Sequence, residues 1–311
     1  MLIGAYSYFW YRKDWLKLTV RQNDPPVLGE YDNTLHGEVI DKQLEMVKQS
    51  GIDFLSLSWD YRYDHGHVID ALKKTNTKAT YFYESLHRER DSRGKVPPSV
   101  LPLILNDMDL IKELTSEDCW LHIDSRPVVM IYVTRAYADP VNALKAIRKR
   151  FNDDVFLVGD ELWWDPLNIE SLKQLDAVTG YNFYCPGRFS TVSPEETAST
   201  YLNNIKTQMQ KHVSVCASIG LPVWGNSLPG YNDRGVRGDK NHHPIPRLGG
   251  DFFKRSLADA FEVSTGKEKC IMITSFNEHY EDSGIESFQS DNGLYLNILK
   301  EFKENNNVHG N

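Results

Sequence analysis

The sequence predicts an α/β protein in which eight parallel strands close into a (β/α)8 TIM barrel. Short apolar segments alternate with segments of helical periodicity along the whole 311-residue chain. The apolar segments are continuous runs rich in Val, Ile, Tyr and Phe, as expected of parallel strands that are covered on both faces. No Pro-, Gly- or Ser-rich linker interrupts the alternation, so we expect a single domain over residues 1–311.

Each expected element can be placed in order. Strand-length apolar runs occupy 2–8, 52–58, 79–83, 127–133, 155–159, 177–181, 221–225 and 270–276. Helical periodicity follows over 38–49, 66–74, 99–116, 140–150, 167–174, 194–217, 251–263 and 291–304. Eight strand and helix pairs favour a closed barrel over an open doubly wound sheet. No G-x-G-x-x-G motif follows a strand, which argues against a dinucleotide-binding fold.

The connections between these elements are unequal in length. Segments from helix to strand are short and polar, as at 49–51 and 75–77. Segments from strand to helix are long and contain most of the tryptophans, as at 9–37, 226–250 and 277–292. All strand-to-helix loops of a barrel emerge at one rim, where barrel enzymes place their active sites. We therefore expect the functional site at that rim.

Composition excludes several classes of function. The chain has 35 Lys and Arg residues against 43 Asp and Glu, a net charge of −8, which disfavours nucleic acid and anionic membranes as partners. No transmembrane segment or secretory leader is visible, which predicts a cytoplasmic protein, or a secreted or periplasmic one if a leader has been removed. The four cysteines are far apart, and His65, His67 and His242–His243 lack a third ligand. We expect no metal and no cofactor.

Aromatic residues gather where the predicted strands end. They are Trp10, Tyr11, Trp15, Trp59, Tyr61, Trp163, Trp164, Tyr184 and Trp224. Flat rings beside carboxylates and amides suit a carbohydrate cleft, because sugars offer apolar faces for stacking and hydroxyls for hydrogen bonds. The same rings can also cap the core of the barrel. Of the possible ligands, an oligosaccharide or polysaccharide fits this rim best.

The segment after the last predicted strand carries the most reactive side chains. Glu278 and Glu281 lie three positions apart, and Glu286 follows five positions later. Glycoside cleavage needs one protonated and one ionised carboxyl group, and two close carboxyl groups push one pKa upward. A solvated acidic loop is the alternative interpretation. Arg237 and Arg247, in the preceding long loop, are placed either to bind a substrate anion or to brace this acidic loop.

The same segment carries a family resemblance. The run from Ile273 to Glu278, followed by Glu281 and Glu286, closely resembles the signature of glycoside hydrolase family 99 and its family 71/99-like (WbsX-like) relatives. Further similar motifs are Tyr8-Phe9-Trp10-Tyr11, Leu28-Gly29-Glu30-Tyr31-Asp32, Gly51-Ile52-Asp53 with Ser58-Trp59, Tyr132-Val133-Thr134-Arg135, and Pro229-Gly230-Tyr231-Asn232-Asp233 with Arg237. The resemblance spans nearly the whole chain.

The resemblance implies a retaining, endo-acting hydrolase of α-mannosidic linkages that needs no metal. Glu278 would be the base that deprotonates the 2-hydroxyl of the sugar, giving a 1,2-anhydro intermediate, and Glu281 the acid/base. The resemblance and the rim together give the expected substrate-binding residues. These are Tyr8, Trp10, Trp59, Glu84, Tyr132, Tyr181, Tyr184, Trp224, Tyr231, Asp233, Arg237, Asn277, His279 and Glu286.

The sequence also departs from the family pattern. His279-Tyr280 stands where the family usually has Trp-His, Ser287 replaces a proline after Glu286, and Asp60 replaces a second Trp after Trp59. These changes leave the shape of the sugar pocket open. Two alternatives therefore stand beside the hydrolase: a glycosyltransferase-like or polysaccharide-modifying protein of surface-glycan biosynthesis, and a noncatalytic glycan-binding barrel.

Overall fold

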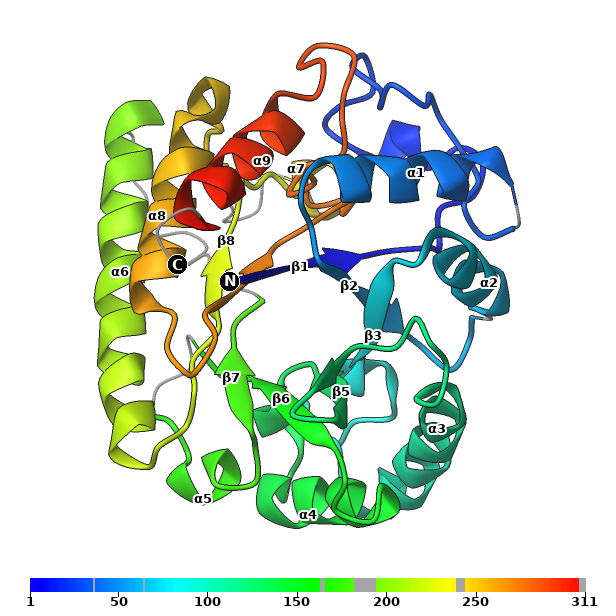
Figure 1. Ribbon diagram of the computed structural model, residues 1–311, viewed down its shortest axis with the longest axis vertical. Coiled ribbons are helices and arrows are strands. Elements are labelled where there is room, and N and C mark those ends of the chain that lie inside the picture. The colour runs from blue at the N-terminus through cyan, green and yellow to red at the C-terminus, as the bar shows by residue number, and fades with distance from the viewer. Residues whose placement is uncertain (36, 64, 163–165, 182–193, 239–243, 308–311) are drawn as a thin grey trace.

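The chain folds into the predicted (β/α)8 barrel. In the computed structural model, parallel strands surround a central axis and helices lie outside them (Figure 1). The structure describes residues 1–35, 37–63, 65–162, 166–181, 194–238 and 244–307. The strands are β1 Leu2–Ser7, β2 Phe54–Trp59, β3 Lys78–Tyr83, β4 His122–Ile123, β5 Arg126–Ile131, β6 Phe156–Asp160, β7 Ala177–Thr179, β8 Gly225–Ser227 and β9 Cys270–Ile273.

The sheet closes on itself. Hydrogen-bonded neighbours follow the order β7, β6, β5, β3, β2, β1, β9 and β8, all parallel. A parallel bridge between Val178 and Val223 joins the two ends of this path. The remaining strand, β4, pairs antiparallel with β5 and lies outside the barrel order.

Helices fill the connections between strands. They are α1 Glu38–Gln49, α2 Gly66–Thr75, α3 Leu101–Leu114, α4 Pro140–Arg150, α5 Ile169–Leu172, α6 Pro194–Ser218, α7 Arg234–Arg237, α8 Asp251–Val263 and α9 Leu294–Asn307. Local sequence sets some of their ends. The Asp139 side chain accepts a hydrogen bond from the Asn142 amide and Pro140 fills the first turn of α4, whereas Asn76 adopts a left-handed conformation and ends α2.

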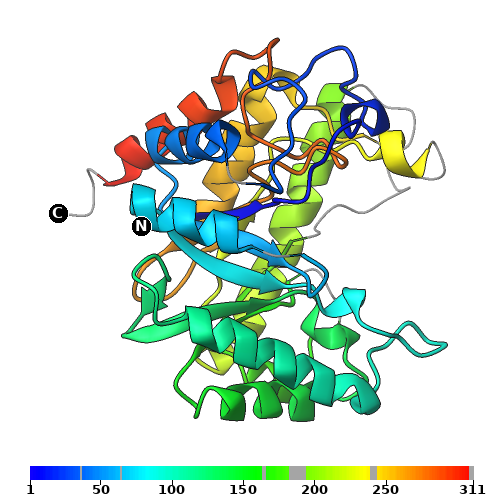
Figure 2. The ribbon, with the colours of Figure 1, turned by 90° about the vertical axis from the view of Figure 1, so that its right-hand side faces the viewer.

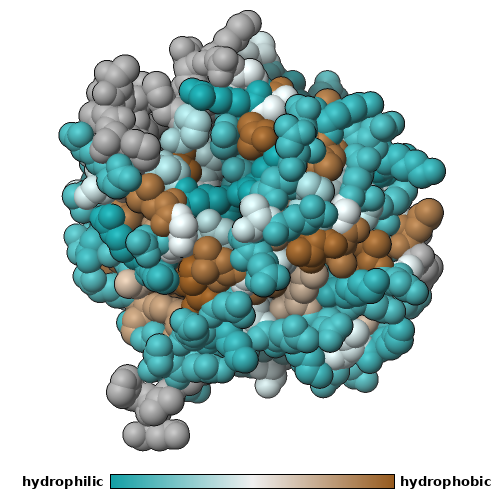
Figure 3. Space-filling view, turned by 90° about the horizontal axis from the view of Figure 1, so that it is seen from above, coloured by the Kyte–Doolittle hydropathy of each residue, from teal (hydrophilic) through white to brown (hydrophobic). Residues whose placement is uncertain are grey.

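The helices are amphipathic and bury one face against the barrel. In α1 the buried residues are Ile40, Gln43, Leu44 and Val47, which recur with the helical period. Hydrophilic residues cover most of the face shown in Figure 3, with hydrophobic residues between them. Within the described residues, no helix is both long and apolar enough to cross a membrane.

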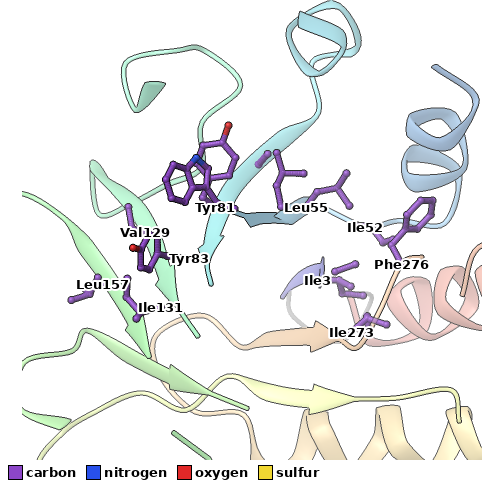
Figure 4. Packing of buried hydrophobic residues seen from close by; sticks show 14 of the residues in the cluster. Ile3, Ile52, Leu55, Tyr81, Tyr83, Val129, Ile131, Leu157, Ile273 and Phe276 are labelled. Atoms are coloured by element: carbon purple, nitrogen blue, oxygen red, sulfur yellow. The ribbon is translucent and has the colours of Figure 1, made fainter. Parts of the chain in front are cut away.

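Alternation along the strands divides the core into two layers. Ile3, Leu55, Tyr83 and Ile131 belong to the cluster packed between the strands and the helices (Figure 4). Tyr6, Phe54, Phe82, Met130 and Phe156 form a second cluster inside the barrel. Burying each large apolar side chain contributes about 1.5–3 kcal/mol, so both layers stabilise the barrel. They also decide which residue at a strand end faces the interior.

The strand ends differ from the sequence prediction at one important place. The run 221–225 was expected to be a complete strand, but the ladder of β8 begins only at Gly225 and continues to Ser227. The residues before Gly225 bond instead to β7, the neighbouring strand on the other side. The Trp224 amide donates to the Val178 carbonyl of β7 at 2.8 Å. Trp224 therefore precedes β8 and does not stand at its carboxyl end. Figure 2 shows the long loops after β3 and β8 together on the side away from the N-terminus.

Candidate active site

A cavity of about 440 Å³ opens at the carboxyl ends of the barrel strands. Its lining residues come from the ends of or the loops after β1, β3, β5, β7, β8 and β9. They are Tyr8, Trp10, Phe82, Glu84, His87, Tyr132, Tyr181, Val236, Arg237, Glu278, Tyr280 and Glu281. Eight of the residues expected at the site are in this set, including both glutamates of the pair.

The loop after β9 is fixed by its own backbone and by one arginine. The Glu278 amide donates to the Ser275 hydroxyl at 2.7 Å, and the Ser283 amide donates to the Glu278 carbonyl at 3.2 Å. The Arg247 guanidinium donates to the carbonyls of Asp282 and Gly284 at 2.7 and 2.8 Å. Of the two roles considered for Arg247, the structure therefore supports bracing of the acidic loop.

Glu278 accepts hydrogen bonds from neutral donors. Its Oε1 atom accepts from the Tyr11 hydroxyl at 3.2 Å and from the Tyr280 amide at 3.0 Å. Burial raises the pKa of Glu278 well above its usual value, and the nearby charge of Glu281 raises it further. Glu278 therefore tends to keep a proton near neutral pH.

Glu281 instead faces a cation. Arg237 Nη2 lies 3.1 Å from its Oε1, and the Tyr181 hydroxyl donates to its Oε2 at 3.2 Å. Burial raises the pKa of Glu281, but the charge of Arg237 opposes that rise. Arg237 is held from behind, because its Nη1 donates to the buried Asp233 at 2.7 Å and to the Tyr231 hydroxyl at 2.8 Å.

A third carboxyl group completes the acidic side of the cavity. Glu84 follows β3 and accepts a hydrogen bond from the Ser58 hydroxyl at 2.6 Å. Burial raises the pKa of Glu84 to about 7. His87, three residues later, also lines the cavity, and its Nδ1 lies 2.5 Å from Oδ2 of the buried Asp60.

Aromatic rings form the remaining walls. The rings of Tyr8 and Trp10 lie 4.6 Å apart, and Tyr132 meets Tyr181 edge to face at 5.7 Å. One carboxylate, that of Asp160, holds the backbone at or next to both tyrosines of the second pair, and we call this arrangement the Asp160 clasp. Asp160, the last residue of β6, accepts hydrogen bonds from the Tyr181 amide at 3.0 Å and from the Val133 amide at 3.3 Å.

The cavity therefore combines three buried carboxyl groups, a guanidinium and several rings. A pair of carboxyl groups that titrate together, one facing a cation and one facing neutral donors, can hold one proton between them. Groups of this kind in a cleft are suited to general acid and base chemistry. No group of three or more His, Cys, Asp or Glu residues in the described ranges is arranged to hold a metal ion.

Two tryptophans expected at the substrate surface lie elsewhere. Trp59 packs outside the barrel against Tyr83, with ring centroids 5.3 Å apart. Trp224 lies inside the barrel toward the strand starts, where it stacks on Phe156 at 6.0 Å. Neither residue lines the cavity, so the structure does not bring these two tryptophans together with the glutamate pair.

Three other expected residues lie behind the cavity wall. Asn277 is fully buried and its side chain bonds the amide and carbonyl of Tyr8, each at 2.8 Å. His279 and Glu286 are buried in a network with the Tyr31 hydroxyl, which lies 2.8 Å from His279 and donates to Glu286 at 2.7 Å. In the structure these three residues support the wall of the cavity and do not line it.

Tyr231 and Asp233 also take a supporting position. Both are buried, and both contact Arg237 rather than line the cavity. Of these three residues, only Arg237 lines the cavity. Tyr184, Trp163, Trp164, His242 and His243 lie outside the described residues.

Sequence reasoning left three residues out of the expected substrate-binding set: Tyr280 and His87, which line the cavity, and the buried Tyr11, which contacts Glu278. Tyr11, Tyr280 and His87 contact or surround the carboxyl groups. His87 could have been found from the sequence, because Glu84 and His87 are two ionisable residues three positions apart after a strand, the same spacing as Glu278 and Glu281. Tyr11 and Tyr280 carried no such spacing, since their roles depend on how the loops after β1 and β9 fold against each other.

The fold is similar to that of several solved structures. Two are structures of the glycoside hydrolase family 99 endo-α-mannosidase of Bacteroides thetaiotaomicron, and each comparison covers 99% of both chains. The complex with bis-tris-propane has a TM-score of 0.73 and 16% sequence identity. The other structure has a TM-score of 0.74 and 14% sequence identity. A third is a glycoside hydrolase-like protein, with TM-score 0.76, 16% identity and coverage of 97% of this chain and 93% of that chain. These likenesses confirm the (β/α)8 fold over the length of the chain.

Comparisons of sequence give no further relative. No protein-family model matches the chain, and no curated protein matches it.

Proposed function

We propose that this protein is a retaining glycoside hydrolase that cleaves α-mannosidic linkages within a glycan. One observation carries the proposal: Glu278 and Glu281 open into the same cavity, among aromatic rings, at the carboxyl ends of the barrel strands. The overall likeness to endo-α-mannosidases over 99% of the chain supports it. The family resemblance of the segment from Ile273 to Glu286 points to the same class of reaction.

The proton needed for bond cleavage is already in the pair. Arg237 favours the ionised form of Glu281, whereas Glu278 faces neutral donors, so in this scheme the shared proton starts on Glu278. A sugar whose 2-hydroxyl donates to Glu278 favours the ionised form of that group, because a hydrogen bond to a carboxylate lowers its pKa. Substrate binding thus moves the shared proton toward Glu281.

In the first step, Glu278 takes the proton of the 2-hydroxyl and O2 attacks the anomeric carbon of the same sugar. The bond from that carbon to the leaving oxygen breaks, and Glu281 gives its proton to the leaving oxygen. The product of this step is a 1,2-anhydro sugar. In the second step, water attacks the anomeric carbon and the bond from that carbon to O2 breaks; Glu281 takes a proton from the water, and Glu278 returns its proton to O2. Two inversions at one carbon give net retention.

The surrounding residues position these groups. Tyr181 and Arg237 hold the two oxygens of Glu281, and Tyr11 holds Glu278. The rings of Trp10 and Tyr8 offer apolar surface for a sugar face. Glu84, with a pKa near 7, offers a carboxyl group that hydrogen-bonds a sugar hydroxyl in either protonation state.

The test separates the roles of the two glutamates. Glu278→Gln and Glu281→Gln should each lower kcat/KM on an oligomannoside by at least about a hundredfold. On an α-mannoside whose leaving group needs no protonation, Glu281→Gln should recover much of the first-step rate, whereas Glu278→Gln should not. Recovery by Glu278→Gln instead would reverse the two roles.

Near-normal rates in both variants would remove the pair from the reaction. Product analysis by NMR spectroscopy should show the α-anomer forming first, as retention requires. A β-anomer as the first product would contradict the two-step route. Transfer of the sugar to an added acceptor without release to water would favour the glycan-assembly alternative over hydrolysis.

A further inference from the structure

A second hollow adjoins the candidate active site. It has a volume of about 380 Å³ and shares two wall residues, Trp10 and Tyr280, with the catalytic cavity. Its other lining residues are Arg12, Lys13, Asp14, Trp15, Lys17, Leu18 and Tyr63. We call this hollow the basic groove. Its volume lies within the range of small-ligand pockets.

The charge of the basic groove differs from that of the whole chain. The chain carries a net charge of −8, but the groove is lined by three exposed cations, Arg12, Lys13 and Lys17, and by one carboxylate, Asp14. Asp14 lies 3.7 Å from Lys17. The neighbouring Asp32 accepts two hydrogen bonds from Thr34, which together with the charges of Arg12 and Lys13 hold its pKa below the usual value, so Asp32 offsets part of the positive charge. The groove therefore presents a local excess of positive charge.

Aromatic rings connect the groove to the catalytic cavity. The Trp10 ring lies 4.6 Å from Tyr8, which lines the cavity, and 6.3 Å from Tyr63, which lines the groove. Tyr280 lines both hollows and its amide contacts Glu278 at 3.0 Å. A chain of sugars that occupies the cavity can therefore continue over Trp10 into the groove, with ring faces available for stacking.

We propose that the basic groove binds an acidic residue of the glycan, a sugar that carries a carboxylate or a phosphate monoester. This inference rests on the proposed function and assigns its substrate class. Arg12 offers a planar fork that can bind either anion through two hydrogen bonds, and the two lysines add positive charge at the same mouth. Asp14 balances part of this charge, and a neutral glycan would leave the remaining excess without a matching group.

The probes are an α-linked mannotetraose and two acidic forms of it. In one form a single residue carries a 6-phosphate, and in the other the same residue is oxidised at C6 to a carboxylate; the modified residue is moved along the tetramer in turn. Binding is measured by isothermal titration calorimetry to the Glu281→Gln protein, so that no probe is consumed. At least one acidic form should bind about tenfold more tightly than the neutral tetramer, since exposed ion pairs are individually weak but three cations act together.

The triple variant Arg12→Gln, Lys13→Gln and Lys17→Gln should abolish that preference. A matched control, Lys48→Gln with Lys145→Gln and Lys149→Gln, removes the same charge from exposed sites on α1 and α4 and should keep it. Tighter binding of the phosphate or of the carboxylate form identifies the source of the anion. Equal binding of acidic and neutral forms, or a preference that survives in the triple variant, overturns the proposal.

The two proposals fail in different ways. Calorimetry does not depend on turnover, so acidic-glycan binding can be established even if the wild-type protein cleaves no α-mannoside. Conversely, cleavage of neutral α-mannosides with no acidic preference would leave the proposed function standing and remove the basic groove as a binding site. Raising the salt concentration should reduce the preference, because exposed charges are screened.

Discussion

The barrel has a hollow at each end, and the larger one is not the candidate active site. The lower hollow, at the starts of the strands, has a volume of about 1000 Å³ and is lined in part by Leu2, Phe156 and Cys270, the first or nearly first residues of β1, β6 and β9. The upper cavity has less than half that volume, about 440 Å³. Volume alone would therefore select the wrong end of the barrel.

The two hollows differ in how their charged groups are held. In the upper cavity Glu84, Glu278 and Glu281 are buried and all have raised pKa values. At the lower hollow Glu268 is 55% exposed and pairs with the amino terminus at 3.2 Å, and Lys269 donates to the Phe261 carbonyl at 2.7 Å. Buried, convergent ionisable groups are typical of active sites, and of these two hollows it is the upper cavity that is lined by such groups.

After the glutamate pair itself, removal of Arg237 should have the largest effect. Arg237→Gln takes the cation away from Glu281, whose pKa should then rise further. We expect kcat/KM to fall by about 10- to 100-fold, the value of a hydrogen bond to a charged group. The pH profile of kcat/KM should also move to higher pH, because the proton that Glu281 gives to the leaving oxygen is then retained to a higher pH. A pH–rate profile of the variant checks this.

The control accounts for the buried partner of Arg237. Because Asp233 would be left without its cation, Arg237→Gln is also made with Asp233→Asn, and thermal unfolding shows whether both proteins are folded. Arg237→Lys, which keeps the charge, should retain the wild-type profile more closely. If the pH–rate profile does not move in Arg237→Gln, alone or with Asp233→Asn, although both proteins are folded, then Arg237 does not control the protonation of Glu281.

The second prediction concerns stability and sharpens the contrast between the two hollows. Burial raises the pKa of Glu84 from 4.5 to about 7, so the folded state binds more protons than the unfolded state between these values. The free energy of unfolding therefore falls as pH rises from 4.5 to 7 and stays lowered above that. Glu84→Gln should be more stable than the wild type at pH 8 by about 3 kcal/mol, with little difference below pH 4.5.

Urea unfolding at pH 4.5 and pH 8 measures this difference. Glu268→Gln at the lower hollow is the matched control, because its side chain is 55% exposed and the substitution therefore removes no buried carboxyl group. If Glu84→Gln and Glu268→Gln are stabilised equally at pH 8, or if Glu84→Gln is destabilised there, then burial of the ionised Glu84 does not lower the stability of the folded protein.

The smallest effect is expected at the lower hollow. Lys267→Ala removes an exposed side chain from its lining, and we expect kcat/KM on the same α-mannoside to change by less than about twofold. Surface changes away from a site rarely alter a protein by more than a few tenths of a kcal/mol. A loss of activity comparable to that of Arg237→Gln would place chemistry at the wrong end and break the comparison.

The barrel was predictable because its signal is spread over many residues. Strands buried on both faces leave continuous apolar runs, and the polar helix-to-strand turns separate them. The expected helix 38–49 coincides with α1, and the expected 140–150 coincides with α4. The convergence of Glu278 and Glu281 was predictable for a related reason, since both follow the carboxyl end of one strand.

The outward or inward direction of single side chains was harder to predict. Successive residues of β2 alternate between the two layers: Phe54 lies inside the barrel, Leu55 outside, and Trp59, at the strand end, again outside. An apolar run on both faces carries no alternating pattern, so the sequence could not assign the side of Trp59. For Trp224 an error of two residues in the strand end was enough to place it at the wrong end of the barrel.

The burial of His279 and Glu286 depends on residues far away in the sequence. Trp15 stacks on the His279 ring at 4.6 Å, and Gln43 of α1 donates to Glu286 at 3.1 Å. These contacts form because the loop after β1 and helix α1 cover the loop after β9. Local spacing reveals that acidic and basic residues are present, but only the folded chain decides which of them meet solvent.

The Asp160 clasp has a consequence for redesign of the protein. One carboxylate ties the chain after β5 to the chain after β7, so Tyr132 and Tyr181 are mounted on a common support. Because Asp160 holds backbone amides, replacing either tyrosine side chain leaves this support in place, and the companion tyrosine feels the change through the ring contact at 5.7 Å. Altered specificity should therefore be sought by exchanging both tyrosines together, with Asp160 kept.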